Sequence, residues 1–395
     1  MADIYERAIA LHEELRGKIA TQLKTDLNSK EDMALVYSPG VAEPCRRIAK
    51  NKADIYKYTG KGNTIAVISN GTAVLGLGDI GPEAALPVME GKCCLFKRFG
   101  DVNAVPLVVD ITDVDEFVEW VKKVGPAFGG INLEDISAPK CIEIERRLIE
   151  EMDIPVFHDD QHGTAIVTTA AVLNSLKLIG KKAEDCTVVM SGVGAAGSSI
   201  IRMLNSIGIK NIYGFNSRGV LNEKDAASYT NPLYKELAKI TNHDQEDLSF
   251  EEAMKKADIF VGVSVKDKVT KEMVKNMKKD PIVFAMANPD PEITYKDAKE
   301  AGARVAGTGR SDDPNQVNNV LAFPGLFKGA LKVHASKITE EMKLAAAYAL
   351  AELVPEDKLA DDYVIPSSFD EGVADHVAEA VAKKAQEQGV ARVME

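Results

Sequence analysis

The apolar residues of this chain alternate between helical and strand-like spacing. Residues 3–24 carry apolar side chains at helical spacing, and residues 41–50 form a second predicted helix after the turn Tyr37-Ser38-Pro39-Gly40. Short apolar runs then alternate with helical segments. We expect strands at 64–69, 104–110 and 131–133, helices at 114–124 and 140–151, and a hairpin turn at Asn70-Gly71 into a strand at 73–75. This alternation predicts an α/β fold with a largely parallel sheet.

The same alternation restarts near residue 163. The expected elements are helices at 164–178 and 198–207 and strands at 187–190, 211–215, 259–263, 282–285 and 305–309. Residues from 323 onward are mostly helical and rich in alanine. At this length two domains are expected. We predict an N-terminal α/β domain at 1–160, a doubly wound domain at 161–322, and C-terminal helices at 323–395 that pack back on the first domain.

Composition narrows the class of protein. The chain has 395 residues, of which 45% are hydrophobic and 27% charged, as in an ordinary globular protein. Its net charge of −12 argues against nucleic acid or an anionic membrane surface as a partner. The five cysteines are odd in number and lie mostly in apolar segments, which indicates reduced thiols. With no signal-like start and no apolar run long enough to cross a bilayer, a cytoplasmic protein is expected.

Two acidic pairs stand out because each ends an apolar run. Glu134-Asp135 follows the strand at 131–133, and Asp159-Asp160 lies between a strand-like segment and a helix. Adjacent carboxylates raise each other's pKa unless a cation compensates. If the fold brings the pairs together, a hard divalent cation such as Mg²⁺ or Mn²⁺ is the natural compensator. The other reading, that all four are solvated loop acids, stays open.

The glycine pattern G-x-G-x-x-G, typical of dinucleotide sites, occurs twice. The first copy is Gly76/Gly78/Gly81, whose following helix we expect Pro87 and Gly91 to interrupt. The second copy precedes a helix without a breaker before Gly208, and a continuous helix is needed to direct N–H groups at a pyrophosphate. We therefore assign the nucleotide to the second loop and expect a Rossmann-type cofactor domain. The cofactor-binding residues of that loop are Gly192, Val193, Gly194, Ala195, Ala196 and Gly197.

The strand after this loop bears on the choice of cofactor. NAD sites usually place an acidic residue at its end, but this strand ends in Asn216-Ser217-Arg218. Asn216 and Ser217 could bond a 2′-phosphate and Arg218 could pair with it, which favours NADP over NAD. The alternative is that Arg218 is only a solvated turn residue.

Five segments in this order closely resemble the malic enzyme family in its short bacterial and archaeal form. They are Val36–Ala42, Gly76–Gly81 with Val88–Lys92, Gly129–Ile136, Phe157–Ala165 and Asn318–Gly325. The resemblance implies oxidative decarboxylation of L-malate to pyruvate and CO2 with NAD or NADP and Mg²⁺ or Mn²⁺. It also implies that the two domains enclose the site between them.

The resemblance assigns roles to single residues. Glu134, Asp135 and Asp160 match the metal ligands, and Asp159 a carboxylate near Lys92. Lys92 would accept the C2 hydroxyl proton, which requires a lowered pKa, and Tyr37 would donate a proton to C3. Asn288 and Asn318 match positions that bond substrate carboxylate and cofactor. His158 and His162 are expected to support the site rather than bind the metal.

The sequence departs from larger members of the family at Ala73, where they have an arginine, so the group that binds the distal carboxylate is open. Two other functions are weighed: a malolactic enzyme, which releases lactate and CO2, and a nucleotide-binding sensor without catalysis. The amphipathic first helix and the family habit predict a homodimer. Neither nucleic acid nor a membrane is expected as a partner.

Overall fold

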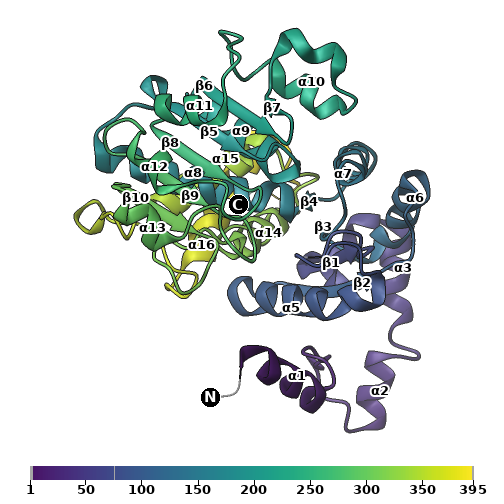
Figure 1. The fold of residues 1–395 in the computed structure, drawn as a ribbon. Helices are drawn as coiled ribbons and strands as arrows, with labels where there is room; N and C mark the ends of the chain where they lie inside the picture. The colour runs from purple at the N-terminus through teal and green to yellow at the C-terminus, as the bar shows by residue number, and fades with distance from the viewer. Residues whose placement is uncertain (1–2, 75, 394–395) are drawn as a thin grey trace.

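The computed structural model describes residues 3–74 and 76–393, whose strands form two largely parallel sheets (Figure 1). The first sheet has the order β2-β1-β3-β4, and its neighbouring strands are parallel. Its strands are β1 (Thr64–Ser69), β2 (Asn103–Val108), β3 (Gly130–Leu133) and β4 (Val156–His158). The connecting helices are α5 (Pro82–Gly100), α6 (Val114–Val124) and α7 (Lys140–Glu151). The predicted α/β fold is confirmed.

The second sheet has the order β10-β9-β8-β5-β6-β7, and only β7 is antiparallel to its neighbour. Its strands are β5 (Thr187–Ser191), β6 (Asn211–Asn216), β7 (Gly219–Val220), β8 (Ile259–Gly262), β9 (Ile282–Ala285) and β10 (Val305–Thr308). The helices of this part are α9 (Ala195–Ser206), α10 (Pro232–Ala238), α11 (Phe250–Lys256), α12 (Lys271–Lys275) and α13 (Tyr295–Glu300). This arrangement is the doubly wound layout that the second half of the sequence predicts.

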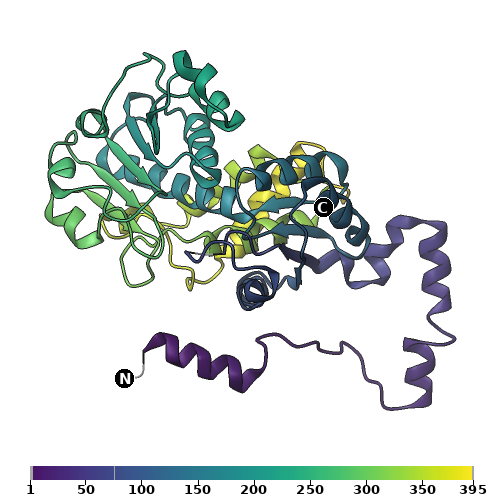
Figure 2. The ribbon, with the colours of Figure 1, turned by 45° about the vertical axis from the view of Figure 1, so that its right-hand side comes forward.

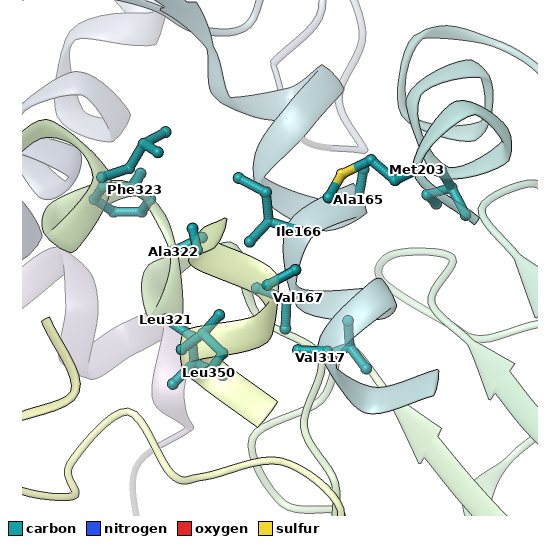
Figure 3. Close-up of a cluster of buried hydrophobic side chains, with 14 of the residues drawn as sticks. Ala165, Ile166, Val167, Met203, Val317, Leu321, Ala322, Phe323 and Leu350 are labelled. Carbon is teal, nitrogen blue, oxygen red and sulfur yellow. The ribbon is translucent and has the colours of Figure 1, made fainter. Parts of the chain in front are cut away.

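Helix α8 (Asp159–Ile179) leads from the first sheet into the second and is buried along most of its length. Figure 3 shows its side chains Ala165, Ile166 and Val167 among residues of α9 and of the C-terminal part. That part contains α14 (Phe323–Lys332), α15 (Glu340–Glu352) and α16 (Val373–Glu387). It also contacts the first domain, since the rings of Phe96 and Phe323 lie 4.6 Å apart. The C-terminal helices therefore pack on both α8 and α5.

The N-terminal arm, residues 4–41, runs outside this body (Figure 2). It contains α1 (Ile4–Leu15) and α2 (Lys30–Val36) and is followed by α3 (Ala42–Lys50) and α4 (Ile55–Tyr58). Large apolar side chains of the arm are exposed to solvent: Ile4, Tyr5, Ile9, Leu11, Leu15, Ile19, Leu23, Leu27, Met33, Leu35, Val36, Tyr37 and Val41. A single chain thus leaves a long apolar surface uncovered.

Several predicted boundaries were wrong. The first helix ends at Leu15 rather than 24, because Arg16 and Gly17 take positive φ. Helix α5 continues through Pro87 and Gly91, since it buries one face on the sheet and that packing outweighs the local break. Helix α2, whose capping box joins Ser29 and Asp32, was not predicted.

The expected strand at 73–75 is replaced by an isolated bridge between Val74 and Gly78, and residue 75 lies outside the described residues.

The short 3₁₀ segments are η1 (Lys52–Asp54), η2 (Gly60–Asn63), η3 (Gly125–Ala127), η4 (Ala183–Asp185), η5 (Glu223–Ser228), η6 (Asn319–Leu321) and η7 (Glu356–Lys358). None of the helices in the described residues is long and apolar enough to span a bilayer.

Candidate active site

A cavity of about 730 Å³ lies where the carboxyl ends of strands from both sheets meet. Glu134 and Asp135 follow β3, Asp160 follows β4, Asn288 follows β9 and Gly309 follows β10. Ligand sites of parallel sheets form at this edge, because loops there can present side chains without disturbing the strands. The remaining described residues of its wall are His12, Lys18, Pro87, Val88, Gly91, Lys92, Leu95, Thr164, Met286, Val317, Asn318 and Asn319.

Lys92 is the centre of a buried charge cluster in this wall. Its Nζ lies 2.6 Å from Asp159 Oδ2 and 2.8 Å from Glu134 Oε1, and all three side chains are buried. The ammonium also lies over the ring of Phe323, 4.2 Å from its centroid, which orients it further. Asn319 donates its amide to Asp159 Oδ2. The lysine predicted as proton acceptor is therefore held against two of the predicted acidic residues.

The cluster holds more negative than positive charge. Burial disfavours the Lys92 ammonium, but contact with Asp159 and Glu134 outweighs burial and raises the pKa of Lys92. Burial, with the neighbouring carboxylates, also raises the pKa of Glu134 well above its ordinary value despite Lys92. Burial raises the pKa of Asp159 in the same way. Burial alone therefore does not lower the pKa of Lys92, because two carboxylates contact one ammonium; the lowering expected from a bound dication stays a prediction.

The donor set suits a hard divalent cation. Glu134, Asp135 and Asp160 all line the cavity, and the buried Asp159 Oδ1 has no hydrogen-bond partner. In residues 3–74 and 76–393, however, no group of three metal-binding side chains is already gathered. Asp160 Oδ2 accepts the backbone N–H of Asp135 at 2.9 Å. The carboxylate oxygens of these residues are the kind of ligand that a hard divalent cation binds, but their side chains would have to rotate to complete the site.

Glu145 of α7 holds the junction between β4 and α8, which carries Asp159 and Asp160. One of its oxygens accepts the backbone N–H of His158 at 2.8 Å, and the other accepts Gln161 Nε2 at 3.0 Å and lies 2.9 Å from His162 Nε2. Burial disfavours the charge, but His162 and Lys343 outweigh burial and lower the pKa of Glu145 to about 2. His162 thus serves the scaffold of the site, as expected. The sequence analysis overlooked Glu145, because its role depends on a contact between α7 and α8.

The second glycine loop has the geometry that a pyrophosphate requires. Gly192 has a φ of 91°, and a Cβ on Gly197 would lie 1.9 Å from Gly192 O. Gly194 immediately precedes α9, which begins at Ala195 rather than at the predicted residue 198. The loop therefore directs N–H groups of Ala195 and Ala196 from a helix N-terminus, where an anion is favoured.

The turn after β6 shows a structural role for one of the three predicted residues. Asn216 Oδ1 accepts the backbone N–H groups of Arg218 at 2.7 Å and of Gly219 at 3.1 Å. Ser217 and Arg218 are exposed. Asn216 shapes the turn, and Ser217 and Arg218 remain available to a ligand.

Of the other predicted site residues, some lie in the cavity wall and one does not. Asn288 and Asn318 line the cavity, and Asn318 also caps η6 by accepting the Val320 N–H at 3.0 Å. Tyr37 is 71% exposed and is not among the described residues of the wall. Asn319 and Lys18, both of which line the cavity, were not predicted. Asn319 lies in the segment 318–325 that carries the resemblance, whereas nothing in the sequence marks Lys18.

Comparison with known proteins agrees with this geometry. The family model of the malic enzyme N-terminal domain matches residues 16–149, and that of the malic enzyme NAD-binding domain matches residues 161–386. The chain is 56% identical over 388 residues to the bifunctional malic/malolactic enzyme of Bacillus subtilis, covering 98% of this chain and 94% of that protein. It is 51% identical to the NAD-dependent malic enzyme of Geobacillus stearothermophilus, covering 99% of this chain and 81% of the relative.

A solved structure gives the same result. The malic enzyme of Pyrococcus horikoshii superposes with a TM-score of 0.95 at 44% identity, covering 100% of this chain and 93% of the other. Both halves of the sequence, both sheets and the cavity between them are thus accounted for by one family. This chain belongs to the malic enzyme family.

Proposed function

We propose that this protein catalyses the oxidative decarboxylation of L-malate to pyruvate and CO2, with NAD or NADP and Mg²⁺ or Mn²⁺. The observation that carries the proposal is Lys92, buried between Glu134 and Asp159 in the wall of a cavity that the cofactor sheet also lines. When bound, the dication would polarise the C1 carboxylate and C2 oxygen of malate, and NAD(P)⁺ would take up the hydride. Glu134, Asp135 and Asp160 would hold the dication.

The residues of the chain account for the proton transfers. Asp159 accepts a proton from Lys92 across their 2.6 Å contact, which leaves an amine able to accept the C2 hydroxyl proton. Decarboxylation then breaks the C3–C4 bond, and the Tyr37 hydroxyl donates a proton to C3. Asn288 and Asn318 orient the substrate carboxylate and the cofactor.

The position of Tyr37 bears on the oligomeric state. Tyr37 is exposed and lies on the N-terminal arm, whose apolar side chains are also uncovered. We therefore propose a homodimer in which the arm packs on a second copy and Tyr37 enters the site of that copy. In a symmetric dimer each site would then use one residue from each chain.

Mixing two inactive variants tests this arrangement. Tyr37→Phe and Lys92→Met are each expected to be inactive, but a mixed dimer would contain one intact site. Random pairing makes half of the dimers mixed, so the mixture should recover about a quarter of the wild-type activity. No recovery after confirmed subunit exchange would place Tyr37 in its own chain's site.

The main experiment measures reduced nicotinamide with L-malate and Mn²⁺, with NADP and NAD in parallel, before and after a chelator. Chelator-sensitive formation of reduced cofactor and pyruvate is expected, and its absence would refute the proposal.

We keep NADP as the preferred cofactor on the basis of Arg218. We also propose the domain division 1–160, 161–322 and 323–395 and a cytoplasmic location, which suits the five free cysteines.

A second function is malolactic activity, favoured by the name of the Bacillus subtilis relative. It would require the site to retain pyruvate and reduced cofactor until the ketone is reduced to lactate. Lactate formed from malate without net cofactor reduction would establish this activity. The third function, a sensor without catalysis, would be favoured only if malate is not consumed.

A further inference from the structure

We infer that Lys18 binds the distal carboxylate of the substrate, a 2-hydroxy dicarboxylate. The inference rests on the proposed function and identifies a residue that fixes substrate specificity. Lys18 follows α1 on the N-terminal arm and lines the active-site cavity from the side of α5.

The backbone N–H and the backbone carbonyl oxygen of Lys18 both contact side chains of α5. The Lys18 N–H donates to Glu90 Oε2 at 3.0 Å, and the Cys94 thiol lies 3.6 Å from the Lys18 carbonyl oxygen. Gly17, with a φ of 113°, makes the turn that brings the arm to this position. Lys18 is therefore fixed at the rim of the site, although most of the arm is exposed.

The ammonium of Lys18 contacts the part of α5 that lines the cavity. Lys18 Nζ donates to Pro87 O at 2.6 Å and lies against Gly91, since a Cβ there would be 3.5 Å from it. Lys18 Nζ therefore lies beside the residue that precedes Lys92 in α5, and both lysines line the same cavity. An ammonium has three N–H groups, and the contact with Pro87 uses one of them.

The electrostatics of the cavity require such a group. A dicarboxylate substrate enters a wall that carries Glu134, Asp135 and Asp160. A dication can offset these carboxylates and bind the C1 end, but the distal carboxylate needs its own cation or donor. Lys92 is already held by Glu134 and Asp159.

Two other candidates for binding the distal carboxylate, the position of Ala73 and the two asparagines, are less suitable than Lys18. Ala73, where larger relatives have an arginine, donates its N–H to Asp135 O at 3.1 Å and is not among the described residues of the wall. Those residues include no arginine, and their only lysines are Lys18 and Lys92. The amides of Asn288 and Asn318 can orient a carboxylate but cannot neutralise it. His12 also lines the wall, with its Nδ1 2.7 Å from Ala8 O. Of the two lysines, Lys18 is the one that is not paired with Glu134 and Asp159, so it is the lysine available to the distal carboxylate.

Steady-state kinetics of full-length Lys18→Met test the inference, because methionine keeps the apolar stem and removes the charge. The KM for L-malate should rise about tenfold or more, the effect of losing one charge-assisted hydrogen bond. The KM for the cofactor should stay unchanged. Lys18→Arg should restore the KM for malate to within about threefold, since it keeps the charge.

Oxalate supplies the discriminating readout, because its two carboxylates span only the C1 and C2 positions and cannot reach the distal subsite. Its inhibition constant should be unchanged in Lys18→Met. Equal weakening of malate and oxalate would overturn the inference, as would an unchanged KM for malate. The matched control is Lys24→Met, an exposed lysine of the same arm that is not part of the wall.

Failure of the proposed function would look different, since the wild-type protein itself would not turn over malate. Calorimetric binding of malate to wild type and Lys18→Met, with Mn²⁺ and NADP present, would still measure the role of Lys18. Lys18→Gln is carried alongside as a second neutral variant, and circular dichroism confirms that each variant is folded.

Discussion

Lys343 Nζ lies 3.1 Å from His162 Nδ1, although the two residues are 181 positions apart in the sequence. Lys343 belongs to α15 and is buried, and His162 belongs to the first turn of α8, next to the acidic pair. The other nitrogen of His162 faces Glu145 at 2.9 Å. A C-terminal helix thereby fixes the turn that carries Asp159 and Asp160.

The first prediction concerns this network. Glu145→Ala leaves the His158 N–H, the Gln161 amide and His162 without their shared acceptor in a buried position. Loss of one partner of a buried charged network costs about 3–5 kcal/mol of folding free energy. Urea unfolding should show this loss, whereas Glu143→Ala, at an exposed position of the same helix, should change stability by less than about 0.5 kcal/mol. Equal effects of the two variants would contradict the structural role.

The second prediction concerns Lys92. Lys92→Met removes the group that accepts the C2 hydroxyl proton, so kcat for malate should fall by a factor of about 10²–10⁴. Initial rates with saturating cofactor and Mn²⁺ measure it. Lys97→Met is the control, because Lys97 is an exposed lysine of the same helix whose contacts are Asp101 and Asn103. Retention of near-normal kcat by Lys92→Met would remove Lys92 from the chemistry.

The third prediction concerns cofactor choice. If Arg218 pairs with a 2′-phosphate, Arg218→Ala should raise the KM for NADP by about tenfold or more through loss of a charge-assisted contact. The KM for NAD should remain the same and serves as the internal control. A variant that affects both cofactors equally, or neither, would show that Arg218 is a solvated turn residue.

The fourth prediction concerns pH and the cofactor sheet. Asp258 is buried at the start of β8, accepts the Thr187 N–H at 2.9 Å and contacts Lys181 and Lys278. Burial opposes its charge, but these hydrogen bonds outweigh burial and lower the pKa of Asp258 below its ordinary value. A lowered carboxyl pKa contributes stability above the unfolded pKa and loses it as the pH falls through the folded pKa.

Asp258→Asn should therefore reduce the free energy of unfolding at pH 7 by about 1.5–3 kcal/mol. The difference from wild type should shrink as the pH falls below about 4, the ordinary range of an aspartate. Chemical unfolding at a series of pH values measures both effects. A difference that stays constant from pH 7 to pH 3 would show that the charge of Asp258 is not responsible.

The sequence by itself determined the layout of this protein. Alternation of strand and helix periods gave the two parallel sheets, because burial of a strand on both faces requires a continuous apolar run. We assigned the nucleotide to the second glycine loop because its helix has no breaker before Gly208, but α5 after the first loop is continuous as well, so helix continuity does not separate the two loops. Gly192 and Gly197 lie where a Cβ would meet backbone atoms. The acidic pairs were found because charged groups at strand ends have few structural reasons to be there, whereas Lys92, inside α5, was found only through the resemblance to the malic enzyme family.

Only the tertiary structure decided which groups meet. Glu145, Lys343 and Asn319 look like ordinary helix or turn residues in the sequence, and their contacts with His162 and Asp159 depend on how distant elements pack. The sign of the Lys92 pKa shift likewise depends on two carboxylates that approach it in space. Lys18 lines the cavity through the docking of the arm on α5, and Tyr37 is exposed on the same arm. Local sequence sets the period and the turns, whereas the charge around a buried group is set by neighbours far along the chain.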